Sequence, residues 1–142
     1  MSISKATGTW DGSAKEGKGT MKPENGPEVP FSVATRFEGV KGSNPEEMIG
    51  AALAGCFSMA LAFGLAGAKV TPKSIRTTAD VKLDKVEGGF AISSIALTCE
   101  ADVPGLDAAK FKEIAETTKK GCPVSKALAA VSSITLDAKL VG

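Results

Sequence analysis

The chain has no histidine and no tyrosine among its 142 residues. The lack of histidine excludes Ser-His and Cys-His nucleophile pairs, imidazole metal ligands and imidazole acid–base catalysis. Any chemistry therefore has to come from cysteine, carboxylate, lysine or arginine side chains. The chain has 17 basic and 16 acidic residues, and neither sign forms a run. It therefore lacks the charge pattern of a surface that binds nucleic acid or an anionic membrane.

Cysteine is scarce as well. Cys56, Cys99 and Cys122 are far apart in the chain and form no C-x-x-C pair, so a thioredoxin-type motif is absent and a tetrahedral zinc site would need a carboxylate. We therefore expect no bound metal and no bound cofactor. The first ten residues lack the apolar stretch of a secretory signal, which favours a cytoplasmic protein.

The order of hydrophobic patterns predicts an α+β fold with largely antiparallel sheets in a single domain. Glycine-rich turns separate alternating segments in the first forty residues, where we expect a β-hairpin and then an edge strand at 31–37 that includes Arg36. Asn44, Pro45 and Glu47 form a helix-start pattern. The expected elements are the N-terminal strands at 1–40, a central helix at 45–68, a β-hairpin at 74–103, two helices at 107–130 and a final strand at 133–141.

The central helix carries no charged residue from Met48 to Ala68. Twenty-one residues at about 1.5 Å each would span about 30 Å, so a membrane helix is one interpretation. However, the segment consists mainly of small residues, has no Trp or Tyr belt, and the amphipathic strands need an apolar partner. We therefore expect a buried helix. Because a chain of this length can hardly surround it, the sequence predicts a dimer in which each subunit covers the other's helix.

The three cysteines occupy different predicted environments. Cys99 alternates inward on a strand and is expected to be a small core residue. Cys122 comes directly before Pro123 at the start of a short helix, where free N–H groups lower a thiol's pKa, so we expect it to form a thiolate readily. Cys56 lies on an apolar helix, where a packing role is more frequent than a catalytic one.

Three segments together resemble the OsmC/Ohr family of organic hydroperoxide reductases, on its OsmC branch. They are TRFEGVKGSNPEEMIGAALAGCFSMAL (35–61), TTADVKLDKVEGGFAISSIALTCEADVPGLD (77–107) and GCPVSKAL (121–128). The resemblance implies an OsmC-like fold, with antiparallel sheets packed around a long central helix. It also implies an intertwined homodimer with active sites at the subunit interface.

The resemblance also implies roles for four residues. Cys56 in AGCFS matches the peroxidatic cysteine and Cys122 in GCPVS the resolving cysteine, while Cys99 matches no catalytic position. Arg36 and Glu46 match an active-site arginine and glutamate, and we expect Arg36 to stabilise the thiolate and Glu46 to orient Arg36 through a bidentate pair. The implied activity is a thiol peroxidase that reduces organic hydroperoxides through a sulfenic acid and a Cys56–Cys122 disulfide. An external dithiol of the lipoyl type would restore the thiols.

The sequence allows two arrangements of the central helix and two functions for the cysteine pair. In an unbroken helix, ten residues separate Glu46 from Cys56 by about 15 Å, so either Arg36 bridges them or the helix breaks near residues 50–55. We expect a break, because Gly50 and Gly55 weaken the helix. The alternative function is a non-catalytic redox sensor, in which the same cysteines oxidise once and signal to a partner.

Overall fold

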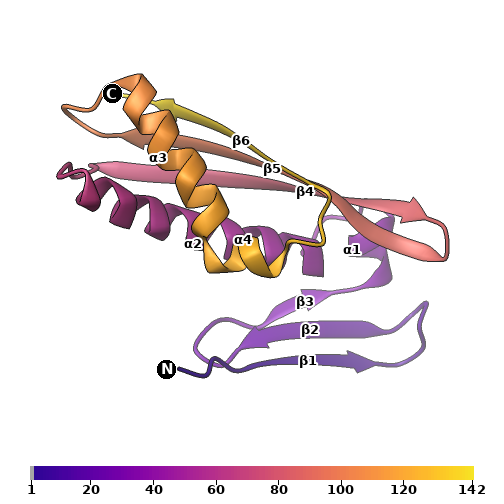
Figure 1. Cartoon of the computed structure of the whole chain (residues 1–142). Helices are drawn as coiled ribbons and strands as arrows, with labels where there is room; N and C mark the ends of the chain where they lie inside the picture. The colour runs from indigo at the N-terminus through magenta and orange to yellow at the C-terminus, as the bar shows by residue number, and fades with distance from the viewer. Residues whose placement is uncertain (1) are drawn as a thin grey trace. The chain divides into compact units, whose positions relative to one another are not determined.

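The computed structural model describes residues 2–142, and the chain divides into two compact units, Met1–Met48 and Ile49–Gly142. In the first unit, β1 (Ala6–Asp11), β2 (Lys18–Pro23) and β3 (Val29–Phe31) form an antiparallel sheet in the order β1-β2-β3. Helix α1 (Val33–Phe37) follows (Figure 1).

A pair of aromatic rings organises the N-terminal sheet. The ring centroids of Trp10 and Phe31 lie 5.6 Å apart, and both rings lie over Gly19, where a Cβ atom would come within 2.5 Å of Phe31 and 2.7 Å of Trp10. Few other residues are covered in this unit. Of its described residues, only Gly17, Gly19 and Glu46 are buried, so the sheet has little core of its own.

The strand predicted at 31–37 is wrong beyond Phe31, because residues 33–37 form α1. Ser32 caps this helix: its hydroxyl accepts from the Thr35 N–H, and the Thr35 hydroxyl accepts from the Ser32 N–H. These two reciprocal bonds satisfy free donors at the helix start, and they outweigh the alternation of apolar residues. The S-x-x-T spacing was the signal that could have predicted α1.

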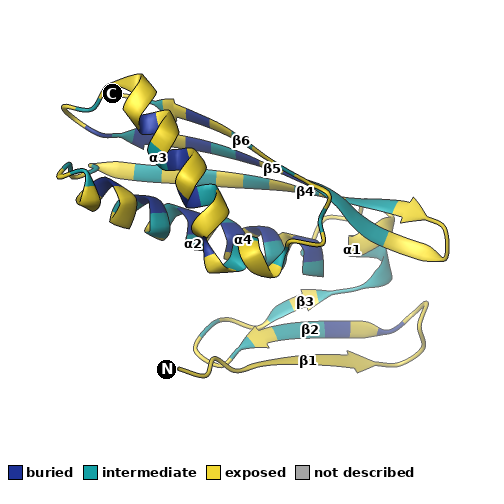
Figure 2. Cartoon of the chain, viewed as in Figure 1, coloured by how far each residue is buried: buried dark blue, intermediate teal, exposed yellow. Residues whose placement is uncertain are grey.

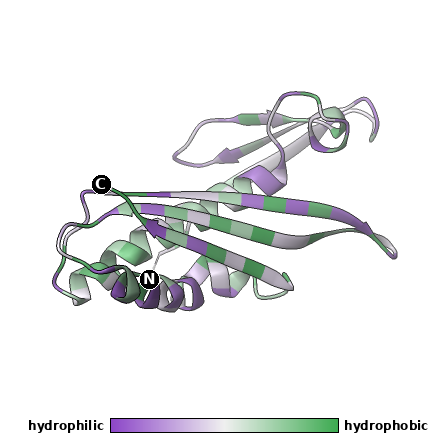
Figure 3. Ribbon diagram, turned by 90° about the horizontal axis from the view of Figure 1, so that it is seen from above, coloured by the Kyte–Doolittle hydropathy of each residue, from purple (hydrophilic) through white to green (hydrophobic). Residues whose placement is uncertain are grey.

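The second unit contains the predicted hairpin, helices and final strand. β4 (Ser74–Val86) pairs antiparallel with β5 (Gly89–Asp102), and β6 (Ser133–Leu140) pairs parallel with β5. The parallel pairing follows from the crossover through α3 (Ala108–Gly121) and α4 (Pro123–Ala127), because a parallel neighbour needs a long connection. Apolar and polar residues alternate along these strands (Figure 3).

Helix α2 (Pro45–Gly67) supplies one wall of the core of the second unit. One row of its side chains is fully buried together with the inward side chains of β5 and with Phe111 of α3 (Figure 2). Small residues allow close approach, since a Cβ at Gly50 would lie 3.1 Å from Val81 of β4 and one at Gly64 would lie 3.0 Å from Ile114 of α3. The buried row consists of Leu53, Phe57, Leu61 and Leu65.

The opposite face of α2 is apolar but uncovered in the single chain. Met59 is 63% exposed and Phe63 is 72% exposed. By length and composition α2 could cross a membrane, a test that the core helix of a soluble protein also passes. The sequence predicted a helix that is covered on all sides. Within one chain, only one face of α2 is covered.

Candidate active site

The structure brings Cys56 and Cys122 together. The Cys122 thiol donates to the Cys56 sulfur over 2.7 Å, although 66 residues separate the two in sequence. Cys56 comes from the middle of α2, whereas Cys122 joins the end of α3 to the start of α4. Both are free thiols; Cys122 is fully buried and Cys56 is partly exposed. The contact has the spacing from which two sulfur atoms can form a disulfide with a small movement.

The pKa of Cys122 is raised, so the expectation of a thiolate at this position is wrong. Burial and the hydrogen bond with Cys56 raise the pKa of the Cys122 thiol, and they outweigh the opposing hydrogen bonds from the backbone of Ser125 and Val124. The predicted helix start is present, with Pro123 at the first helical position. Its N–H groups act in the predicted direction, but the desolvation of a fully buried sulfur is stronger.

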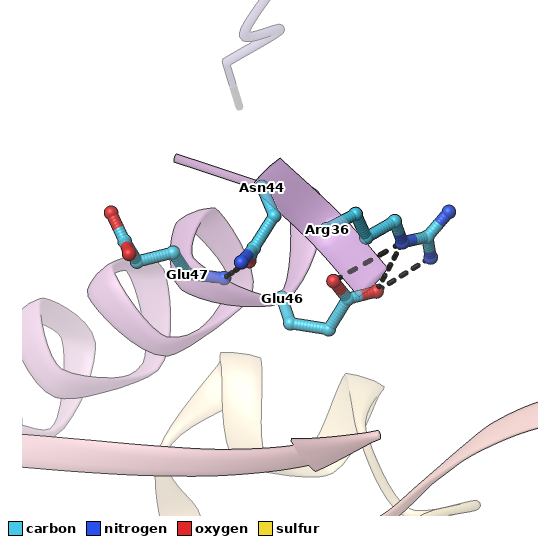
Figure 4. A network of polar contacts seen from close by, with 4 residues as sticks. All are labelled: Arg36, Asn44, Glu46 and Glu47. Atoms are coloured by element: carbon cyan, nitrogen blue, oxygen red, sulfur yellow. Dashed lines mark hydrogen bonds and ion pairs between the residues drawn. The ribbon is translucent and has the colours of Figure 1, made fainter. Parts of the chain in front are cut away.

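Arg36 and Glu46 form a charged pair within the first unit. Arg36 Nε lies 3.1 and 3.2 Å from the two carboxylate oxygens of Glu46, and Nη2 lies 2.5 Å from Oε1 (Figure 4). The Glu46 side chain is buried, and the guanidinium also lies over the Phe37 ring at 5.1 Å. These three nitrogen–oxygen contacts fix the orientation of the guanidinium plane.

Local helix starts position this pair. Arg36 lies on α1, and Glu46 lies in the first turn of α2, where Asn44 accepts from the Glu47 N–H over 2.8 Å (Figure 4). The expected cap at Asn44 is therefore confirmed. The Glu47 carboxylate accepts from the Ser43 hydroxyl over 3.1 Å, in place of the backbone bond of a capping box. An acidic first turn complements the positive end of the helix dipole.

Helix α2 is unbroken from Pro45 to Gly67, so the predicted break near residues 50–55 is wrong. A helical glycine costs only about 1 kcal/mol relative to alanine. Gly50 is buried against Val81 and Ala79 of β4, and this packing supports the helix where its intrinsic propensity is low. Glu46 and Cys56 therefore lie ten residues apart on one continuous helix.

Cys99 is a buried core residue, as predicted. It is 0% exposed on β5, and burial raises the pKa of its thiol against the opposing effect of a hydrogen bond from the Thr77 side chain. Among the described residues, no group of three or more cysteines and carboxylates could hold a metal ion. Cys56 and Cys122 are two free cysteines in contact with each other in the second unit.

Comparison with known proteins identifies the family. The chain is 56% identical to peroxiredoxin OsmC of Escherichia coli over 92% of both chains. Its fold is similar to the OsmC-like protein of Mycoplasma pneumoniae, with a TM-score of 0.78 at 19% identity over 99% of both chains. It is also similar to the organic hydroperoxide resistance protein OhrB of Bacillus subtilis, with a TM-score of 0.70 at 26% identity over 95% of this chain and 98% of the other. Because residues 38–137 match the model of OsmC-like proteins, the chain belongs to the OsmC-like family.

Proposed function

We propose that this protein is a thiol peroxidase that reduces organic hydroperoxides to alcohols. The observation that carries the proposal is the 2.7 Å contact between the sulfurs of Cys122 and Cys56. The names of two relatives, peroxiredoxin OsmC and organic hydroperoxide resistance protein OhrB, support a role in removing peroxides. Without histidine in the chain, sulfur chemistry is also the redox chemistry that the sequence can supply.

The proposed reaction begins at Cys56. Its thiolate attacks the terminal oxygen of ROOH, the O–O bond breaks, and the leaving alkoxide takes a proton to become the alcohol. Cys56 is left as a sulfenic acid. The sulfur of Cys122 then attacks the sulfur of Cys56, the S–O bond breaks, and the leaving hydroxide takes the Cys122 thiol proton and departs as water, so that a disulfide forms.

The contrast between the two thiols supports this assignment of roles. The raised pKa of Cys122 keeps that group a neutral thiol at pH 7, so it is poorly suited to the first attack on a hydroperoxide, and in the second step it must give up its proton to the departing oxygen of the sulfenic acid. Cys122 is fully buried, whereas Cys56 is partly exposed, so a hydroperoxide reaches Cys56 more easily. We therefore assign Cys56 as peroxidatic and Cys122 as resolving.

Arg36 is proposed to stabilise the Cys56 thiolate and to bind the peroxide oxygens, with Glu46 holding its guanidinium in place. The charged pair within the first unit supports the second half of this assignment. Because α2 is unbroken, ten residues separate Glu46 from Cys56, and the proposed role of Glu46 is to hold Arg36 rather than to contact Cys56 itself.

The active form is proposed to be a homodimer. Uncovered Met59 and Phe63 on α2, and the small core of the N-terminal sheet, both favour a second copy as the covering layer. A dithiol of the lipoyl type is proposed to reduce the Cys56–Cys122 disulfide. Light scattering after size exclusion tests the dimer, which a monomer at micromolar concentration would contradict.

Turnover tests the peroxidase. Purified protein with excess dihydrolipoamide should consume many equivalents of cumene hydroperoxide, and Cys56→Ser should abolish this consumption. Cys99→Ser is the matched control and should retain it. After one equivalent of peroxide without reductant, peptide mapping should find Cys56 linked to Cys122 and Cys99 free. Stoichiometric oxidation without turnover would support the redox sensor, and a disulfide that includes Cys99 would overturn the site assignment.

A further inference from the structure

A hydrogen bond between two hydroxyl groups joins α2 to the sheet two residues after Cys56. Ser58 Oγ donates to Thr77 Oγ1 of β4 over 2.7 Å, at a partly buried position. Across the β4–β5 pair, Thr77 lies opposite the buried Cys99. Within residues 2–142, no other side-chain hydrogen bond is found between α2 and this sheet. The remaining contacts between them are made by apolar side chains.

The bond lies on the opposite flank of α2 from the cysteine pair. Successive residues of a helix point about 100° apart. Phe57 is fully buried in the core, so Cys56 and Ser58 lie about 100° to either side of it. Cys56 meets Cys122 on one flank, and Ser58 meets Thr77 on the other. A turn of α2 about its axis therefore moves both contacts together.

Ser58 is the only hydroxyl-bearing residue of α2. The row that reaches Ser58 at intervals of four residues consists of Glu46, which pairs with Arg36, and of Gly50 and Ala54, which have no side chain beyond a methyl group. Apolar contacts between small groups are non-directional, whereas a hydrogen bond needs a defined distance and angle. With side chains, a helix has a radius of about 5 to 6 Å, so a turn of about 10° shifts a side-chain tip by about 1 Å.

We propose that Ser58 and Thr77 are positioning residues, whose hydrogen bond sets the angle of α2 at which the Cys56 sulfur meets Cys122. The inference rests on the proposed function, in which these two cysteines form the redox pair. Its consequence is that the Ser58–Thr77 bond favours closure of the disulfide. Without this bond both cysteines are still present, but the Cys56 sulfur can move out of contact with Cys122.

The test is the equilibrium between the protein and glutathione, which needs no peroxide. Cys56 attacks oxidised glutathione and releases one glutathione; Cys122 then attacks the mixed disulfide and releases the second, so two electrons pass to glutathione. The variants are Ser58→Ala and Thr77→Val. Thr77→Ser keeps the hydroxyl, and Thr78→Val is the matched control on the outward face of β4.

Ser58→Ala and Thr77→Val should each lower the equilibrium constant for disulfide formation by about threefold to tenfold, the range expected for one net hydrogen bond. Their double variant should do little more than either one, and Thr77→Ser and Thr78→Val should match the native protein. A merely structural bond would lower the melting temperature but leave this constant unchanged, and that result would overturn the proposal. If the glutathione equilibrium constants differ among the variants as expected but the native protein does not turn over peroxide, the result would count against the proposed function alone.

Discussion

The Cys122 thiol donates to the Cys56 sulfur at 2.7 Å, and this contact joins the middle of α2 to the junction of α3 and α4. The donor is the buried thiol whose pKa is raised, and the acceptor is the more exposed sulfur. The two cysteines therefore have unequal environments, which agrees with the different roles proposed for them.

Replacing Cys122 should separate the two chemical steps. In Cys122→Ser, Cys56 should still react with one equivalent of cumene hydroperoxide, but the sulfenic acid should persist because no thiol lies beside it to form a disulfide. Dimedone labelling followed by mass spectrometry measures this species. Cys99→Ser should give little adduct, as the native protein does. Strong labelling in Cys99→Ser, or none in Cys122→Ser, would contradict the assigned roles.

Replacing Arg36 by lysine should slow the first step although the charge is kept. An ammonium group cannot reproduce the planar contact of the guanidinium with Glu46, so the group that we propose binds the peroxide would be misplaced. We expect a loss of roughly tenfold to a hundredfold in the rate of Cys56 oxidation, measured by stopped flow. Lys41→Arg on the exposed loop that follows is the control. An unchanged rate in Arg36→Lys would remove Arg36 from the mechanism.

Filling the space above Gly19 should destabilise the N-terminal sheet. In Gly19→Ala the new methyl group would overlap the Phe31 and Trp10 rings, which must shift, and we expect a loss of about 1 to 3 kcal/mol in the free energy of unfolding. Gly8→Ala on β1 meets no atom within 4 Å and is the control. Urea titration followed by the fluorescence of the single tryptophan reports on this sheet. Equal stability of the two variants would contradict the close packing at Gly19.

The reduced protein should lose stability as the pH rises above about 9. Burial raises the pKa of both Cys99 and Cys122 above the ordinary value of 9.0, so above that pH the unfolded chain releases protons that the folded chain retains. Stability then falls with rising pH, whereas below pH 8 the contribution of these thiols is constant. Melting temperatures between pH 7 and 9.5 in the presence of a reductant measure the effect. Cys99→Ala should show a smaller decline, and an undiminished decline would exclude Cys99 as a source.

Helix α2 and the second unit follow the sequence closely because their signals are local and repeated. The start of α2 at Pro45 rests on a proline and a cap, and β4 and β5 alternate over 13 and 14 residues. The failures occur where tertiary contacts decide. Packing against β4 keeps Gly50 helical, and desolvation outweighs the helix start at Cys122. Neither effect can be read from neighbouring residues.

The candidate site was predictable in part. Resemblance identified Arg36, Glu46, Cys56 and Cys122, and the structure shows contact within each of the two pairs. The helix that carries Arg36 was missed, since a five-residue helix has too few residues to show a periodic pattern. Ser58 was missed because a serine in an apolar helix gives no signal until its partner strand is known.

The scarcity of buried residues before Met48 has a consequence for the motion of Arg36. Segments with little covered surface open locally at a lower free-energy cost than the core of the same molecule. Amide hydrogens of α1 should therefore exchange with deuterium well before those of β5, whose side chains at Ile95, Leu97 and Cys99 are fully covered. Arg36 is then expected to lie in a segment that opens at a lower free-energy cost than the core in which Cys122 is buried.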